Sequence, residues 1–110
     1  MVFRVDWDRD AREELMRIPV AERRAVMNAV AKLEAFGDHL GAPHTSQIMG
    51  SPARIRELRP RAGRSPWRAL YRRAADTIVI LAVGPEAKHD RHGFDRAVRL
   101  AEERLKEMEG

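Results

Sequence analysis

Arginine, a side chain well suited to binding phosphate, is concentrated in one stretch of this sequence, residues 53–73. Eight arginines there stand against a single acid, Glu57, so the stretch carries a net charge of +7. The whole chain carries only +4, and the remaining residues therefore sum to −3. A planar guanidinium group binds two phosphate oxygens at once and stacks on nucleobases. The clustering predicts a polyanion site, most simply for RNA, at Arg54, Arg56, Arg59, Arg61, Arg64, Arg68, Arg72 and Arg73.

Two other interpretations of this charge remain open. Isolated arginines on a strand are often merely solvated, but eight like charges repel one another at a cost that a bound polyanion would offset. Between residues 33 and 87 there is no lysine, so arginine supplies the permanent positive charge of this segment. Unlike lysine, arginine can bind two phosphate oxygens at once. An acidic protein partner would satisfy the same field, and charge alone does not distinguish it from a nucleic acid.

Groups that could move a proton lie just beyond the last apolar strand, in the segment 88–92. His89 and His92 there could transfer a proton near pH 7, although a plain surface role is the alternative. None of the four histidines has a metal-ligand spacing such as HExxH, and the sequence has no cysteine to assist them. The sequence therefore predicts neither a metal nor a cofactor.

Two aromatic residues, Trp67 and Tyr71, lie within the arginine stretch at positions i and i+4 of a predicted strand. They share one face, where they could stack on bases or belong to the core. We favour the core for Trp67, whereas both interpretations stay open for Tyr71.

The elements that must position these groups follow from hydrophobic periodicity. Alternation predicts a strand at residues 2–7, and two helices follow, separated at Ile18-Pro19 and ended by Gly37. A loop at 37–52 leads to strands at 53–59, 67–73 and 77–83, the last apolar on both faces, and a helix over 94–108 closes the order β-α-α-β-β-β-α. We expect an α+β fold with a small, mostly antiparallel sheet, helices packed on one face and the arginines on the other, open face.

Length and composition set further limits. A chain of 110 residues with 44% apolar residues predicts a single domain over 1–110. The lack of cysteine excludes disulfides, thiolate metal sites and cysteine nucleophiles. With no apolar run of about 18 residues and no leader-like start, we expect a cytoplasmic protein without a membrane span.

The order of several short motifs resembles the RelE/ParE superfamily of toxins, and in particular the HigB-like branch of type II toxin–antitoxin systems. These motifs are Glu57-Leu58-Arg59, then Trp67 to Arg72, then the apolar strand Ile78–Val83 and a terminal helix rich in arginine and alanine. The resemblance covers most of the chain. It implies a RelE-like fold and a metal-independent endoribonuclease, in which the ribose 2′-hydroxyl of mRNA attacks the adjacent phosphate on the ribosome.

The resemblance also suggests roles for particular residues. By motif position, Arg59 and Arg68 are the first candidates to stabilise the phosphorane dianion, and Arg56 and Lys88 are the second. Tyr71, His89 or His92 would assist proton transfer or stack on a base. Many members carry a lysine pair after the central strand, whereas this chain has Gly84-Pro85 with Lys88 displaced, which leaves the general base unassigned.

The partners implied by the resemblance are a cognate antitoxin, commonly a helix-turn-helix, HigA-like protein, together with the ribosome and its mRNA. Promoter DNA would be reached only through the antitoxin, and no membrane is involved. Two alternatives remain: a ParE-like toxin that inhibits gyrase, and a non-enzymatic module that binds nucleic acid or an antitoxin through the same charges.

Overall fold

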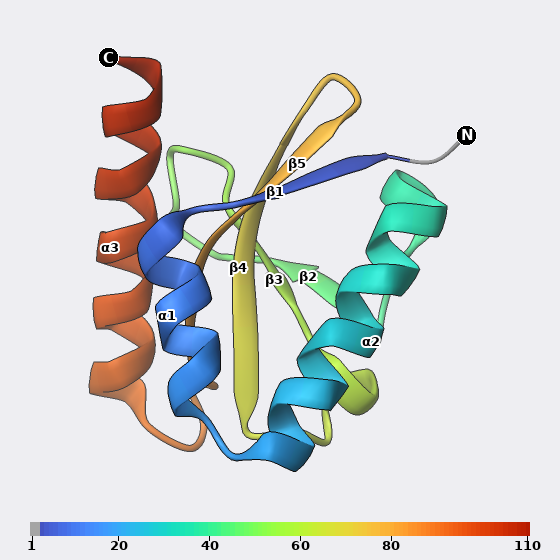
Figure 1. The fold of residues 1–110 in the computed structure, drawn as a ribbon. Helices are drawn as coiled ribbons and strands as arrows, with labels where there is room; N and C mark the ends of the chain where they lie inside the picture. Colours follow the sequence, from blue (N-terminus) through green and yellow to red (C-terminus); the bar gives the residue numbers. More distant parts are fainter. Residues whose placement is uncertain (1–2) are drawn as a thin grey trace.

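The computed structural model describes residues 3–110, and Val2, the first residue of the predicted strand 2–7, lies outside the described residues. Within this range, the two N-terminal helices are α1 (Arg9–Arg17) and α2 (Val20–Phe36), and the last helix is α3 (Arg91–Glu109) (Figure 1). The strands are β1 (Arg4–Trp7), β2 (Thr45–Gln47), β3 (Arg56–Leu58), β4 (Trp67–Ala74) and β5 (Thr77–Pro85). Single 3-10 turns lie at η1 (Gly37–His39) and η2 (Pro60–Gly63).

The five strands form one mixed sheet in the order β1-β5-β4-β3-β2. Only the β1–β5 pair in this sheet is parallel, so the prediction of a mostly antiparallel sheet in an α+β fold is confirmed. Strand β2 was not predicted from the sequence and lies inside the predicted loop 37–52. Its three residues pair with β3, and a strand that short has no periodicity to detect.

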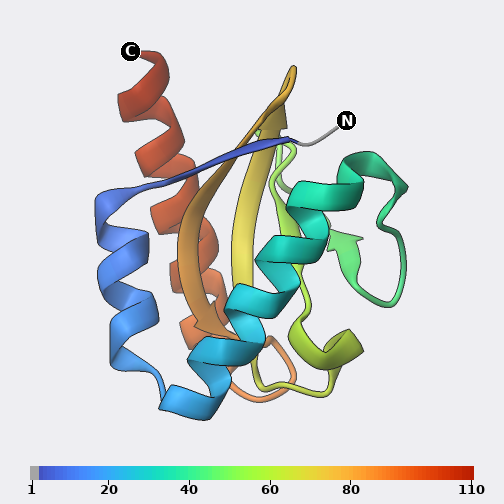
Figure 2. The same cartoon turned by 45° about the vertical axis from the view of Figure 1, so that its right-hand side comes forward.

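The helices cover both faces of the sheet, and the expectation that they share one face is wrong. Helices α1 and α2 pack over one apolar core, which includes Leu58, Ile78 and Ile80 from the sheet. Helix α3 packs over a second core on the opposite face, which includes Leu70 and Leu81. Figure 2 shows α2 in front of the sheet and α3 behind it. Because β5 is apolar on both faces, each face needs a cover, and no open face remains beneath it for the arginines.

Local signals fix where the helices begin and end. The Asp8 carboxylate caps α1 by accepting hydrogen bonds from the backbone N–H groups of Asp10 and Ala11 at 2.9 and 3.0 Å. Helix α2 ends at Gly37, where φ is +53° and an added Cβ would lie 1.9 Å from the Phe3 ring. Asp90 caps α3, which therefore begins at Arg91, a few residues earlier than the sequence predicted. Over residues 3–110, no helix combines the length and apolar character needed to cross a membrane.

Candidate nucleic-acid interface

The connection between β3 and β4, residues 59–66, carries three of the eight arginines, and we call it the arginine loop. Three consecutive residues in it adopt left-handed backbone conformations: Arg61 with φ 54°, Ala62 with φ 55° and Gly63 with φ 93°. Such a conformation costs about 1–2 kcal/mol for a residue with a side chain. The loop keeps this shape only if the surrounding structure holds it in place.

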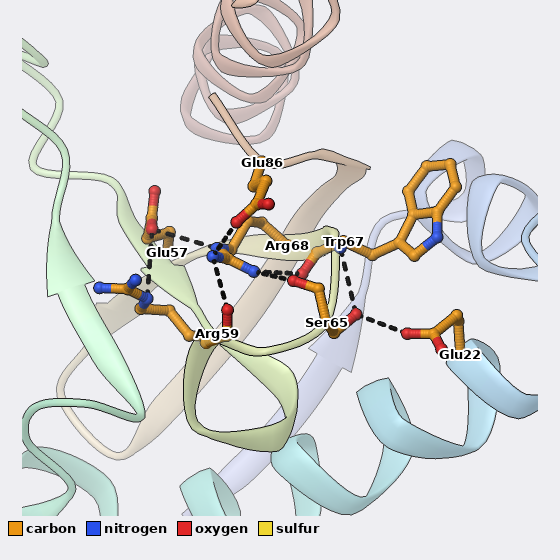
Figure 3. A network of polar contacts seen from close by, with 8 residues as sticks. Glu22, Glu57, Arg59, Ser65, Trp67, Arg68 and Glu86 are labelled. Carbon is orange, nitrogen blue, oxygen red and sulfur yellow. Dashed lines mark hydrogen bonds and ion pairs between the residues drawn. The ribbon is translucent and has the colours of Figure 1, made fainter. Parts of the chain in front are cut away.

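Arg68 holds the arginine loop from the side of the sheet. The residue is only 2% exposed, and its guanidinium group donates to the backbone oxygens of Ser65 at 2.6 Å and Gly63 at 3.4 Å (Figure 3). The same group is paired with two acids, Glu86 Oε2 at 2.6 Å and Glu57 Oε1 at 3.3 Å. All three of its nitrogens therefore already have protein acceptors. The structure gives Arg68 a positioning role, and the phosphate contact predicted for it would require Glu86 to move away.

Glu22, in the first turn of α2, holds the arginine loop from the other side. Its carboxylate accepts a hydrogen bond from Ser65 Oγ at 2.6 Å and pairs with the guanidinium of Arg61. Ser65 Oγ in turn accepts from the backbone N–H of Trp67 at 3.1 Å, so the contact extends into β4 (Figure 3). The hydrogen bond from Arg61, followed by that from Ser65, lowers the pKa of Glu22 below its ordinary value of 4.5.

Replacing Glu22 by glutamine should lower the free energy of unfolding at pH 7 by less than about 1 kcal/mol, since the pair lies near the surface. A lowered folded-state pKa means that the charged form contributes stability above pH 4.5 and that this contribution is lost as the pH falls through the folded value. Urea unfolding at pH 7 and at pH 3.5 should therefore show wild type and Glu22→Gln converging at the lower pH. A difference that stays constant with pH would show that the ionic contact does not stabilise the loop.

Two guanidinium groups of the arginine loop are open to a ligand. The Arg59 side chain is 35% exposed and lies over Gly63, where an added Cβ would come within 3.1 Å of it. Its Nε is buried, lies 3.8 Å from Glu57 Oε1 and makes no hydrogen bond to any residue in the described range 3–110. Arg64 is exposed, and its Nε donates to the backbone oxygen of Arg61 at 3.1 Å. The loop thus presents Arg59 and Arg64 in a fixed arrangement.

The remaining predicted arginines point elsewhere, and the expected convergence of all eight on one open face is wrong. Arg56 donates to Tyr71 Oη at 3.3 Å and to Thr45 Oγ1 at 3.2 Å. Arg73 pairs with Asp38 and lies over the Phe3 ring, and Arg72 lies 3.9 Å from Glu109 at the end of α3. Arg54 is exposed in the loop before β3 with φ 58°. Acids from distant segments, Asp38 and Glu109, thus lie against two of these side chains, those of Arg73 and Arg72.

The aromatic and titratable candidates divide in a similar way. Tyr71 is 4% exposed and belongs to the core under α1 and α2, which favours the core interpretation over base stacking. Trp67 packs against the same core, as expected. Lys88 and His89 are exposed in the loop between β5 and α3, and His92 is exposed in the first turn of α3. Their roles in proton transfer stay predictions.

The acids that shape the site were missed by sequence reasoning. Glu22 and Glu86 lie 43 and 18 positions away from the residues that they bind, Ser65 and Arg68. The available signal for Glu86 was its place immediately after the apolar strand, where site residues often gather. Among the described residues, no group of three or more histidines or acids is placed to hold a metal ion. The chemistry offered is that of fixed cations able to stabilise a developing phosphate charge.

Comparison with protein families matches residues 13–106 to the family described as phage derived protein Gp49-like (DUF891). No curated protein sequence matches the chain significantly. The matched range includes the second half of α1, all of α2, the arginine loop and most of α3.

Solved structures of RelE toxins have a similar fold. A double mutant of the E. coli toxin RelE in the free state matches with a TM-score of 0.64 at 17% identity, covering 90% of this chain and 97% of that chain. The toxin–antitoxin complex RelBE2 from Mycobacterium tuberculosis matches with a TM-score of 0.61 at 24% identity, covering 78% and 100%. The archaeal RelE–RelB complex from Pyrococcus horikoshii gives 0.57 at 22%, covering 77% and 96%. The predicted RelE-like fold is confirmed, whereas the narrower HigB-like branch stays a prediction.

Proposed function

The chain belongs to the Gp49-like family of phage-derived proteins, and we propose that it is the toxin of a type II toxin–antitoxin module that cleaves mRNA on the ribosome. One observation carries the proposal. A fold like that of RelE toxins presents a preformed loop, and the open guanidinium groups of Arg59 and Arg64 project from it. The chemistry of this loop supports a phosphate-binding role more strongly than any other.

The proposed reaction needs no metal. The ribose 2′-oxygen of one nucleotide attacks the adjacent phosphorus, a proton leaves that oxygen, and the bond from phosphorus to the 5′-oxygen of the next nucleotide breaks. The departing 5′-oxygen takes up a proton. Arg59 would stabilise the extra negative charge on the phosphate oxygens in the transition state, since its guanidinium is already charged and oriented. Lys88 and His89, exposed on the neighbouring loop, are the groups available to move protons.

Expression of the chain from an inducible promoter tests the proposal. We expect growth arrest, with new mRNA ends detectable by primer extension within minutes of induction. Intact mRNA in arrested cells, together with inhibited gyrase supercoiling, would instead identify a ParE-like toxin. One observation favours that second candidate: the pairing of Arg68 with Glu57 and Glu86 removes a predicted phosphate ligand from the site. If growth is undisturbed, the remaining alternative is a non-enzymatic module that binds nucleic acid or an antitoxin.

The proposal predicts how RNA binding depends on salt. Each phosphate neutralised on a single strand contributes a slope of about −0.7 to the logarithm of the affinity against the logarithm of salt concentration. Replacing Arg64 by alanine should therefore make the slope shallower by about 0.7, whatever the sequence of the RNA oligonucleotide. Arg17→Ala, at the exposed end of α1, is the matched control. Equal slopes for wild type and Arg64→Ala would show that Arg64 contacts no phosphate.

A cognate antitoxin is the proposed protein partner, and a groove between α1 and α2 is a suitable surface for it. The groove, of about 480 Å³, is lined by Trp7, Leu15, Met16 and Met27, with Arg12 and Arg23 at its sides. The side chains of both methionines are exposed. An acidic amphipathic segment fits this combination, with its apolar face in the groove and its carboxylates on the arginines. The RelBE2 and RelE–RelB structures contain toxin and antitoxin together.

Replacing Met27 by aspartate should prevent neutralisation, because a carboxylate in an apolar contact is costly and would repel an acidic partner. Expressed together with the antitoxin gene of its own operon, the Met27→Asp chain should arrest growth, whereas the wild-type chain should not. Met108→Asp, on the exposed end of α3, is the control and should remain neutralised. Neutralisation of Met27→Asp would place the antitoxin on another surface.

A further inference from the structure

A second concave site lies between α1 and α3, at the end of the sheet where β4 begins and β5 ends. It has a volume of about 310 Å³ and is lined by residues that include Trp67, Pro85, His89, Asp90 and Arg96. Of the residues that line it, the chemistry proposed for the arginine loop uses only His89. Its volume lies at the lower end of the range of about 300–1,000 Å³ that is usual for small-molecule sites.

One wall of the cavity is formed by Trp67, which also packs against the apolar core under α1 and α2. The backbone N–H of Trp67 is held by Ser65 Oγ at 3.1 Å, and its indole points away from Arg59 and Glu57 (Figure 3). The indole N–H donates no hydrogen bond to any acceptor within residues 3–110, although Trp67 is half-buried. Pro85 and Leu100 add apolar surface to the lining. A flat apolar wall of this kind accepts the face of any nucleobase.

The polar groups around this wall match the edge and the phosphate of a nucleotide. His89 and Arg96 are exposed, and neither side chain forms a hydrogen bond or ion pair inside the described part of the chain. Asp90 uses Oδ1 to accept from the backbone N–H of Gly93 at 3.0 Å, which leaves its Oδ2 as an acceptor for a base amino group. The site therefore combines a stacking surface, a cation and an acceptor.

A nearby acid does not oppose an anionic ligand. Glu14, which also lines the cavity, is paired with Arg104 through both carboxylate oxygens, at 3.0 and 2.9 Å. It also accepts from the backbone N–H of Val83 at 3.0 Å. Its charge is thus balanced within the protein, so the lining charges left for a ligand are Arg96, which would meet the phosphate, and Asp90, which would meet the edge of the base.

We propose that this cavity binds a single nucleotide, with the base stacked on Trp67 and the phosphate at Arg96. The ligand is either a free nucleoside monophosphate or an unpaired nucleotide of an RNA strand, because both offer the same base and phosphate. The site needs no cleavage at the arginine loop, so it does not depend on the proposed function. For an RNA ligand it would add a base contact to the phosphate contacts of Arg59 and Arg64.

Fluorescence of Trp67 tests the proposal directly. The chain has two tryptophans, and Trp7→Phe leaves Trp67 as the only reporter. AMP, GMP, CMP and UMP, or a short single-stranded RNA, should quench this fluorescence saturably, whereas inorganic phosphate at the same concentration should not. Quenching by mononucleotides identifies a free nucleotide as a ligand, and quenching by RNA alone identifies a strand. Loss of a charge-assisted contact in Arg96→Ala should weaken binding about tenfold.

Arg99→Ala, on the same helix but outside the cavity, is the matched control and should bind like the parent. The proposal is overturned if neither nucleotides nor RNA quench Trp67, if phosphate quenches equally well, or if Arg96→Ala and Arg99→Ala bind alike. If the chain cleaves mRNA but neither nucleotides nor RNA quench Trp67 fluorescence, the nucleotide site is disproved and the proposed function stands. Saturable quenching by a chain that cleaves nothing would sink the proposed function and leave the inference standing.

Discussion

Replacing Arg68 by alanine should destabilise the fold by about 3–5 kcal/mol, the cost of breaking a buried ion pair from one side. The change removes the guanidinium that pairs with Glu57 and Glu86, which leaves Glu86 unpaired and Glu57 with only the longer contact to Arg59 at 3.8 Å. It also removes the donor to the backbone oxygens of Gly63 and Ser65, which fix the arginine loop. A loss of this size is a large part of the stability of a small domain.

Urea unfolding at pH 7 measures the effect, with Arg54→Ala as the control. Arg54 is exposed and belongs to the same arginine stretch, so its replacement should change the unfolding free energy by less than about 0.5 kcal/mol. A second variant, Arg68→Lys, keeps the charge and should recover only part of the stability, because an ammonium group cannot reach all of these acceptors. If Arg68→Ala is as stable as wild type but fails to cleave RNA, Arg68 is a catalytic residue after all.

Replacing Arg59 by alanine should reduce mRNA cleavage by a factor of about 10²–10³, the range seen when one preorganised transition-state donor is removed. The side chain is 35% exposed and its nearest acid, Glu57, keeps Arg68 as a partner. The fold should therefore lose less than about 1 kcal/mol. Arg59 and Arg68 thus separate the two roles, since one change affects the reaction and the other affects stability.

Single-turnover cleavage on programmed ribosomes measures the first effect, and a thermal melt of the same preparation measures the second. Arg59→Lys is the informative companion, because it keeps the charge and loses the planar fork, and we expect an intermediate rate. Arg73→Ala is the control, because Arg73 is already paired with Asp38 and its replacement should leave the cleavage rate unchanged. Full activity in Arg59→Ala would show that Arg59 does not stabilise the transition state, and Arg64 and Lys88 would then be the remaining candidates.

The sequence predicted the elements of the fold well where periodicity is local and strong. The buried face of α2 is formed by Val26, Val30 and Leu33, and the helix ends at Gly37, which has a positive φ. Both features were predictable because each depends on residues only a few positions apart. The layer arrangement was predicted wrongly, although the decisive signal was available. A strand apolar on both faces needs a cover on each, so α3 had to lie opposite α1 and α2.

The candidate site was predictable only in part. Composition located the cations, but it could not show that Glu86 and Asp38 come from other segments to pair with Arg68 and Arg73, or that Arg72 lies near Glu109 at the end of α3. Those pairs depend on how β4 lies against α3 and η1, which no local pattern encodes. The stretch of eight arginines therefore reduces to a loop with two open guanidinium groups, Arg59 and Arg64, fixed by Arg68 and Glu22.

The proposed cleavage is best measured by incubating the purified chain with ribosomes that translate a defined mRNA and mapping the mRNA ends by primer extension. The proposed endonuclease should give new ends that require the ribosome, need no added metal beyond that of the ribosomes, and become about 10²–10³ times less abundant with Arg59→Ala. Intact mRNA in the presence of a chain that still arrests growth would contradict it, and so would cleavage that Arg59→Ala leaves unchanged.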